Sequence, residues 1–171
     1  MTSSKTIWTI GHSTHLFDEF LELLRSFEIK MLADIRSFPG SRRYPHFNKE
    51  ALERTLPEHG IEYIHIPELG GRRKAISESH HPEWKHPAFR SYADYMDTSE
   101  FKIGIGHLQE LALRSRTAYM CSEALWWRCH RSLVSDYLKS NGWTVLHIMG
   151  KGKQAEHPYT TVARAAQEKL F

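Results

Sequence analysis

The segment from residue 121 to 131 gathers side chains that can act as nucleophile, acid, base and cation, in the order Cys121-Ser122-Glu123-Ala124-Leu125-Trp126-Trp127-Arg128-Cys129-His130-Arg131. Glu123 follows an apolar run, and a carboxylate at a strand end can transfer protons or orient arginines. Cys129 lies where a helix-period segment begins, and helix N-termini favour anions and lower the pKa of a thiol. We therefore predict an anion site, with Glu123 as acid or base and Cys129 as a nucleophile, unless both cysteines only pack in the core.

The spacing of the cysteines excludes two familiar kinds of cysteine site. Six residues separate Cys121 from Arg128, one more than a thiol phosphatase loop has, and no glycine lies between them to let the backbone wrap an oxyanion. Structural zinc sites use tight cysteine pairs and redox motifs use C-x-x-C, and the chain has neither. We therefore expect no metal and no cofactor, although a thiol-based redox or metal-sensing role stays an alternative.

Arginines recur on the loops that we expect beyond the strands, and arginine grips phosphate or carboxylate through two parallel hydrogen bonds. This pattern predicts that Arg36, Arg42, Arg72 and Arg131 hold an anion. Two alternatives stay open, because loop arginines can be solvated and Arg36 can form a structural ion pair with Asp34. His12 and Asp34 join Glu123 as acid–base candidates, and the remaining predicted ligand contacts are Ser13, Ser41, Gly70, Gly71 and His130.

Short apolar runs alternate with helix-period segments along the chain, which is typical of βα units around a parallel sheet. We expect about five strands, at residues 6–10, 30–35, 62–66, 117–121 and 143–148. The expected fold is a single α/β domain over residues 1–171, with a parallel or mostly parallel sheet and helices on both faces. An incomplete, barrel-like α/β arrangement is the alternative. Ligands bind beyond the carboxyl ends of strands in open parallel sheets, and the candidate residues follow those ends.

About six helices are expected between the strands. The first is capped by Ser13 or Thr14 and has its apolar face at residues 17–24, and the others cover residues 48–59, 89–96, 101–113, 130–140 and 160–170. Residues 74–86 are polar and without period, so we interpret them as a long loop or lid. Only residues 1–4 and the last helical turn are expected to lack order.

Composition limits the classes of function. The formal net charge of +3 argues against tight binding of duplex nucleic acid but allows single strands. The sequence has no run of about 18 apolar residues, so we expect no membrane span. With two cysteines and no export signal, a disulfide framework is not expected, and we predict a cytoplasmic protein.

Four groups of residues carry a resemblance to a known family: Thr9-Ile10-Gly11-His12-Ser13; Asp34-Ile35-Arg36 with Pro39, Ser41-Arg42 and Phe47; His65 with Pro67 and Leu69-Gly70-Gly71; and Cys121-Ser122-Glu123 with Cys129-His130-Arg131. From Thr6 to about Gly150, the chain resembles the family known as domain of unknown function 488. The resemblance implies an α/β fold and a common site, without a reaction. Trp126 and Trp127 are unusual at their position, and we expect them to shape a pocket for a flat ligand.

Three hypotheses for function follow from these patterns. The leading one is a small hydrolase or transferase that acts on a phosphorylated or nucleotide-type anion. The second is a nucleic-acid-binding module without chemistry, for which aromatic side chains among the basic loops would stack on bases. The third is the thiol-based redox or metal-sensing protein.

Overall fold

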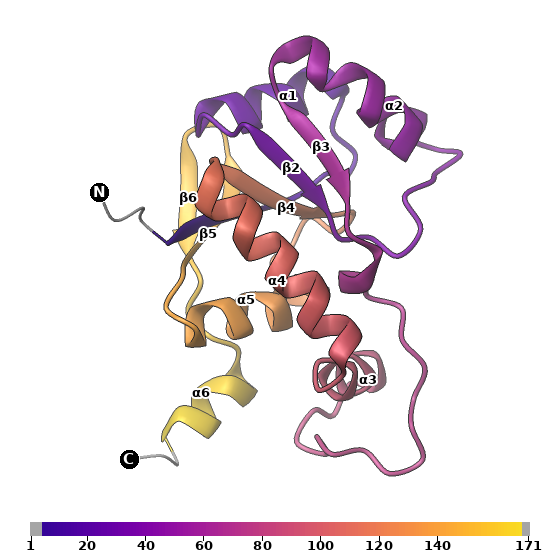
Figure 1. The fold of residues 1–171 in the computed structure, drawn as a ribbon, viewed down its shortest axis with the longest axis vertical. Coiled ribbons are helices and arrows are strands. Elements are labelled where there is room, and N and C mark those ends of the chain that lie inside the picture. Colours follow the sequence, from indigo (N-terminus) through magenta and orange to yellow (C-terminus); the bar gives the residue numbers. More distant parts are fainter. Residues whose placement is uncertain (1–4, 169–171) are drawn as a thin grey trace.

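A computed structural model describes residues 5–168 of the chain, so the expectations for residues 1–4 and for the end of the last helix fall outside the described residues. Six strands form one sheet in the order β3-β2-β4-β1-β5-β6 (Figure 1). Their bounds are β1 (Thr6–Gly11), β2 (Met31–Asp34), β3 (Glu62–His65), β4 (Thr117–Cys121), β5 (Thr144–Gly150) and β6 (Lys153–Glu156).

The expected α/β fold with a mostly parallel sheet is confirmed. Strands β1 to β5 pair in parallel, and only β6 runs antiparallel, as the second arm of a hairpin with β5. The sheet is open, with β3 and β6 at its edges, so it is not a closed barrel. The sixth strand was not expected because Lys153–Glu156 is exposed throughout and shows no apolar alternation.

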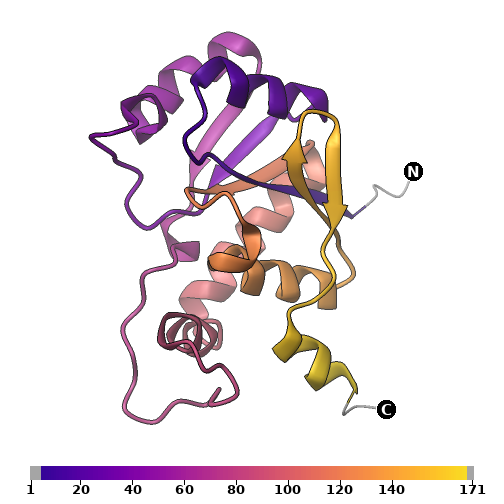
Figure 2. The ribbon, with the colours of Figure 1, turned by 180° about the vertical axis from the view of Figure 1, so that it is seen from behind.

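Helices cover both faces of the sheet (Figures 1 and 2), and each face has its own hydrophobic core. On one face, α1 (Phe17–Ser26) and α2 (Lys49–Thr55) pack leucines and phenylalanines against β1, β2 and β4. On the other face lie α3 (Pro87–Tyr95), α4 (Ser99–Arg114) and α5 (Arg131–Ser140). Figure 2 shows the β5–β6 hairpin at the edge of the sheet, from which the chain continues to α6 (Thr161–Glu168).

The order of the strands creates a crevice at the carboxyl ends of β1 and β4. From β1 the chain crosses the first face through α1 to β2, whereas from β4 it crosses the other face through α5 to β5. The loops that follow these neighbouring strands therefore diverge, and such a switch point is where open α/β sheets bind ligands. Past the strands the pairing continues, since the backbone N–H groups of His12 and Ser13 donate to the carbonyls of Cys121 and Ser122 at 2.9 and 3.0 Å.

Some element ends differ from the expected ones. Helix α1 begins at Phe17 after Leu16, so neither Ser13 nor Thr14 caps it. Asn48 does precede α2, but its side-chain oxygen accepts from the backbone N–H of Ser41 at 2.6 Å instead of capping the helix. The long loop is confirmed, because residues 70–86 contain no helix or strand. Within the described residues, no helix has the length and apolar character needed to cross a membrane.

Candidate functional site

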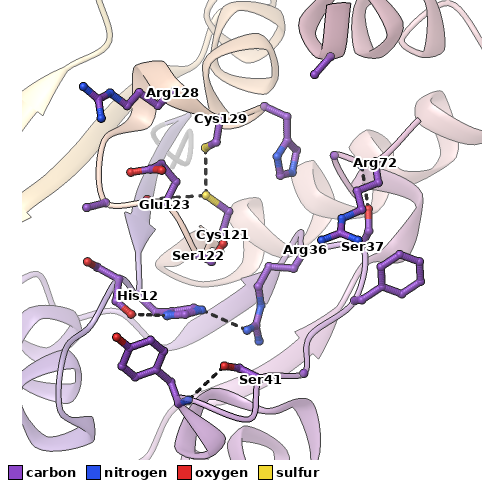
Figure 3. Close-up of a pocket in the computed structure, with 18 of the residues that line it drawn as sticks. His12, Arg36, Ser37, Ser41, Arg72, Cys121, Ser122, Glu123, Arg128 and Cys129 are labelled. Carbon is purple, nitrogen blue, oxygen red and sulfur yellow. Dashed lines mark hydrogen bonds between the residues drawn. The ribbon is translucent and has the colours of Figure 1, made fainter. Parts of the chain in front are cut away.

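A pocket of about 730 Å³ lies at the switch point, beyond the carboxyl ends of β1, β2 and β4 (Figure 3). Nine of the residues predicted for the site line it: His12, Ser13, Arg36, Ser41, Gly71, Arg72, Glu123, Cys129 and His130. The other four do not: Asp34, Arg42, Gly70 and Arg131. The start of α3 adds a wall that the sequence did not indicate, formed by His86, Ala88 and Phe89.

Arg36 forms a buried ion pair with Asp34 at the end of β2, so the structural alternative named for these two residues is present. Arg36 Nε and Nη2 donate to the two carboxylate oxygens of Asp34 at 2.9 and 2.7 Å. The hydroxyl of Tyr63 donates to the same carboxylate at 2.5 Å, and Arg36 Nη2 also donates to the carbonyl of Phe47. Burial alone would lower the pKa of Arg36, but the hydrogen bonds and charge of Asp34 raise it. Asp34 is thus enclosed by its partners.

His12 is neutral and has a fixed tautomer. Its Nδ1 lies 2.9 Å from the carbonyl oxygen of Ser13, which only accepts, so Nδ1 carries the hydrogen. Its Nε2 accepts from Arg36 Nη1 at 3.2 Å. Burial, and to a smaller extent the charge of Arg36, lower the pKa of His12 from 6.5 to about 4 against the opposing hydrogen bond with Ser13. His12 can therefore act as a base only if Arg36 moves away.

Arg131 lies beneath the pocket, in contact with both cysteines. Its side chain is 1% exposed, and Nε donates to Cys121 Sγ at 3.1 Å while its backbone N–H donates to Cys129 Sγ at 3.4 Å. Nη2 donates to the carbonyl of Glu123 at 2.5 Å, and Nη1 donates to the hydroxyl of Thr9 at 3.1 Å. Both ends of this guanidinium are occupied by protein groups.

A chain of buried polar groups continues from Arg131 away from the pocket. The Thr9 hydroxyl lies 2.6 Å from His147 Nδ1, His147 Nε2 lies 2.9 Å from His157 Nδ1, and His157 Nε2 lies 2.7 Å from Asp136. Arg131 only donates and the Asp136 carboxylate only accepts. One arrangement gives every hydrogen an acceptor: Arg131 donates to Thr9, Thr9 to His147, His147 to His157, and His157 to Asp136. Burial, with the charges of His157 and Arg131, lowers the pKa of His147 to about 2, so this ring is neutral.

Sequence reasoning did not find this chain of hydrogen-bonded side chains. The available signal was the composition of α5. Arg131, Ser132 and Ser135 are all buried on one helix that also carries Asp136, an unusual set of polar residues for the inner face of an amphipathic helix.

The rim of the pocket carries three exposed arginines, Arg43, Arg72 and Arg128. Within the part of the chain that the structure describes, no carboxylate lies within ion-pair distance of any of the three. The Arg72 guanidinium lies 5.5 Å from the ring centre of Phe38, a side chain that is 72% exposed. Arg42, which precedes Arg43 on the loop after β2, is exposed and lies outside the pocket.

The two glycines predicted to approach a ligand instead approach the protein. A side chain at Gly71 would place its Cβ 2.5 Å from His130 Nδ1, and one at Gly70 would meet Ser37 Oγ at 2.5 Å. His130 is fixed by its Nε2, which donates to the carbonyl of Ile35 at 2.8 Å. The close approach of Gly71 and His130 therefore brings two walls of the pocket into contact.

Trp126 packs against the buried histidines of this chain, whereas Trp127 is 47% exposed and packs on Trp126. Trp126 stacks on His147, with ring centres 4.5 Å apart and planes 2° apart, and Trp127 meets Trp126 edge to face. Neither residue lines the pocket at the switch point, but both line a second pocket of about 370 Å³, so their role towards a flat ligand stays a prediction. In the described residues, no group of three or more His, Cys, Asp or Glu side chains is arranged to hold a metal ion.

Comparison with known proteins gives one match. A family model described as Domain of unknown function DUF488 matches residues 16–138. No curated protein and no solved structure matches the chain. The matched region contains β2, β3, β4 and the loops that form most of the pocket, and it ends within α5.

Proposed function

We propose that this chain, which belongs to the family described as Domain of unknown function DUF488, binds a phosphorylated ligand of the nucleotide type in the pocket at the switch point. The observation that carries the proposal is the charge of the lining. Four arginines and a single carboxylate, that of Glu123, line the pocket among the described residues, and the three arginines of the rim have no acidic partner. An unpaired, exposed guanidinium is suited to bidentate contact with a phosphate.

The size and the walls of the pocket favour a ligand larger than phosphate alone. A volume of about 730 Å³ falls in the range of small-molecule sites, which is roughly 300–1,000 Å³. Phe38, Tyr44 and Phe89 line the same pocket as the arginines. An aromatic ring beside a guanidinium provides a stacking surface for a base, so a nucleoside phosphate satisfies both parts of the lining.

If the pocket also performs hydrolysis or group transfer, Glu123 is the residue best placed to act as the base. It is half-buried on the pocket wall, and one of its carboxylate oxygens accepts from the backbone N–H of Leu125 at 3.3 Å. The two other acid–base candidates are engaged, since Asp34 is bound by Arg36 and Tyr63 and the Nε2 of His12 accepts from Arg36.

Calorimetric titration with AMP, ADP, adenosine and inorganic phosphate tests the proposal. We expect the nucleotides to bind and adenosine to bind much more weakly, because the arginines contact the phosphate. Substitution of Arg43, Arg72 or Arg128 by Gln removes a charged hydrogen bond, which corresponds to roughly a tenfold loss of affinity or more. Arg42→Gln is the matched control, because Arg42 is on the same loop as Arg43 but outside the pocket.

Equal binding of adenosine and AMP would contradict the proposal, as would an equal loss of affinity in the Arg42 control and the rim variants. A single-stranded oligonucleotide that binds in an arginine-dependent way, while mononucleotides do not, would replace it with the nucleic-acid-binding hypothesis. A salt titration accompanies each measurement, because phosphate contacts weaken as the salt concentration rises.

A further inference from the structure

The two cysteines face each other across the base of the pocket. Cys121 Sγ and Cys129 Sγ are 3.0 Å apart, and both residues line the pocket (Figure 3). A disulfide has an S–S distance of about 2.05 Å, so a movement of about 1 Å would join them. The segment that would absorb this movement is the loop of residues 122–128 between the two cysteines, which contains no α-helix or strand.

The two sulfurs have different surroundings. Cys121 is buried at the end of β4, and burial together with the neighbouring Cys129 raises its pKa well above the usual value. Cys129 is half-buried at the start of α5. Burial would raise its pKa, but the hydrogen bond from Cys121, the contact with His130 and the charge of Arg131 lower it well below the usual value. These opposite pKa shifts favour Cys121 as the thiol and Cys129 as the thiolate of the pair.

Arg131 provides an independent reason for a negative charge on this pair. A buried cation is strongly destabilising unless an anion compensates it. Among the described residues no carboxylate lies within ion-pair distance of Arg131, and the groups at its Nε and backbone N–H are the two sulfurs. The guanidinium itself contacts Cys121 Sγ, whereas Cys129 Sγ accepts from the backbone N–H, so these contacts support one negative charge on the hydrogen-bonded pair of sulfurs.

We propose that Cys121 and Cys129 form a redox site that reacts with hydroperoxides, in which Cys129 is the attacking residue and Cys121 the resolving residue. The inference concerns the thiols alone and holds whether or not the pocket binds a nucleotide. It is carried by the approach of the two sulfurs, by the buried guanidinium beside them and by the exposure of Cys129 to the pocket.

The reaction has two steps. The Cys129 thiolate attacks one oxygen of the hydroperoxide, an S–O bond forms as the O–O bond breaks, and the departing oxygen takes a proton from solvent to leave as water or an alcohol. The sulfur is oxidised by two electrons to a sulfenic acid. Cys121 Sγ then attacks Cys129 Sγ, the S–S bond forms as the S–O bond breaks, and the hydroxyl group leaves as water with the proton of the Cys121 thiol.

Alkylation of the reduced chain tests the difference between the two thiols. Iodoacetamide is added at pH 6.5 and the labelled peptides are identified by mass spectrometry. We expect Cys129 to react at least about tenfold faster than Cys121, because the thiolate is the reactive form. Its rate should also be nearly constant between pH 6.5 and 8, whereas an ordinary thiol with a pKa of about 8.5 would react faster with rising pH.

Oxidation of the same reduced chain with hydrogen peroxide tests the reaction. We expect the number of titratable thiols to fall from two to none, the mass to fall by two hydrogen atoms, and tryptophan fluorescence to change because Trp126 and Trp127 lie between the joined cysteines. Dithiothreitol should restore all three signals.

Single substitutions assign the two roles. Cys121→Ser should stop at a sulfenic acid on Cys129, which dimedone traps, and Cys129→Ser should leave Cys121 as an unreacted thiol. The inference is overturned if Cys121 is labelled first, if the unaltered chain takes up dimedone without forming a disulfide, or if the disulfide joins two chains. Circular dichroism of each variant confirms that it is folded, and the alkylation of the unaltered chain decides the question if either variant is not.

Discussion

Arg36 and Arg131 are both buried guanidinium groups at the base of one pocket, but their charges are balanced in different ways. Arg36 has a carboxylate in direct contact, that of Asp34, and it also contacts His12 and the carbonyl of Phe47. Arg131 contacts two sulfurs, a hydroxyl and carbonyl oxygens. The Arg36 side of the pocket is therefore a closed ion pair, whereas the Arg131 side has a counter-charge that exists only when a thiol is ionised.

This difference separates a structural cation from one that supports chemistry. The paired hydrogen bonds between Asp34 and Arg36 fix the loop after β2, and the charge of Arg36 adds to burial in lowering the pKa of His12. A thiolate next to Arg131 can be lost by protonation or oxidation. The state of the Arg131 side therefore responds to pH and to oxidants, and the state of the Arg36 side does not respond to oxidants.

The largest effect is expected from the removal of the carboxylate beside Arg36. Asp34→Asn leaves Arg36 buried without an anion, and breaking a buried ion pair from one side costs about 3–5 kcal/mol of the free energy of unfolding. Urea denaturation at pH 7 measures it. A loss below about 1 kcal/mol would contradict the difference between the two arginines, because Arg36 would then be tolerated without a neighbouring carboxylate, as Arg131 is.

Acid should destabilise the protein through the neutral histidines beside the two arginines. Folding lowers the pKa of His12 from 6.5 to about 4, so the unfolded chain binds more protons between these values and the free energy of unfolding falls as the pH falls. The loss through His12 amounts to about 3 kcal/mol at most. His147 contributes in the same direction, since folding lowers its pKa to about 2.

Urea denaturation between pH 7 and pH 4 checks this prediction, with His12→Asn as the informative variant. An asparagine side chain keeps a donor for the carbonyl of Ser13 but does not titrate, so the pH dependence should become shallower. An unchanged slope in this variant would show that His12 does not resist protonation in the folded chain.

A smaller loss of stability is expected at Cys129, where the fold favours the charged form of the side chain and not the neutral form. Because folding lowers the pKa of Cys129, the thiolate stabilises the fold fully above the unfolded thiol pKa, and this stabilisation is lost as the pH falls through the folded value. Cys129→Ser should therefore be less stable than the unaltered chain at pH 8, with a smaller difference at lower pH. Reduced protein and thermal denaturation are suitable for the measurement. Cys121→Ser serves as the control, because a serine hydroxyl at this position can still donate to Cys129 Sγ and should retain this pH dependence.

The smallest effect concerns two tyrosine hydroxyls, one on each side. Tyr63 donates to the Asp34 carboxylate at 2.5 Å, and Tyr119 shares a hydrogen bond of 2.6 Å with the hydroxyl of Ser135. Hydrogen bonds to charged groups are stronger, so Tyr63→Phe should cost about 2 kcal/mol and Tyr119→Phe about 1 kcal/mol. A greater loss in Tyr119→Phe would mean that the Arg131 side depends on its neutral hydrogen bonds more than the Arg36 side depends on charge.

The sequence predicted the parts of the fold that apolar periodicity encodes. Strands β1, β2 and β4 are almost entirely buried, and β3 and β5 are partly buried; all five were expected within a few residues of their observed bounds, whereas β6 is exposed throughout. Its pairing depends on neighbours that are remote in the sequence, such as the bond of 3.0 Å from Trp8 Nε1 to the Gln154 side chain. A local sequence pattern does not indicate such a contact.

Residue types and spacing located the pocket but did not give the direction of each side chain. Arg36, Arg72 and Arg131 looked alike in the sequence because each lies on a loop after a strand or at a helix start. In the structure Arg72 is exposed at the rim, while Arg36 and Arg131 are turned inward to Asp34 and Thr9. The anion contacts predicted for these residues stay predictions, and one partner of Arg131, the hydroxyl of Thr9, comes from a strand more than a hundred residues earlier.

The chain of hydrogen bonds from Arg131 through Thr9, His147 and His157 to Asp136 behaves as a row of aligned dipoles. Each donor points away from the guanidinium, so the negative end of the row faces the cation and the positive end faces the carboxylate. The electrostatic interaction at each end of the row is favourable, and hydrogen bonds in such a row polarise one another. Asp136 thus attracts Arg131 through three intervening side chains while leaving the space beside the guanidinium to the sulfurs.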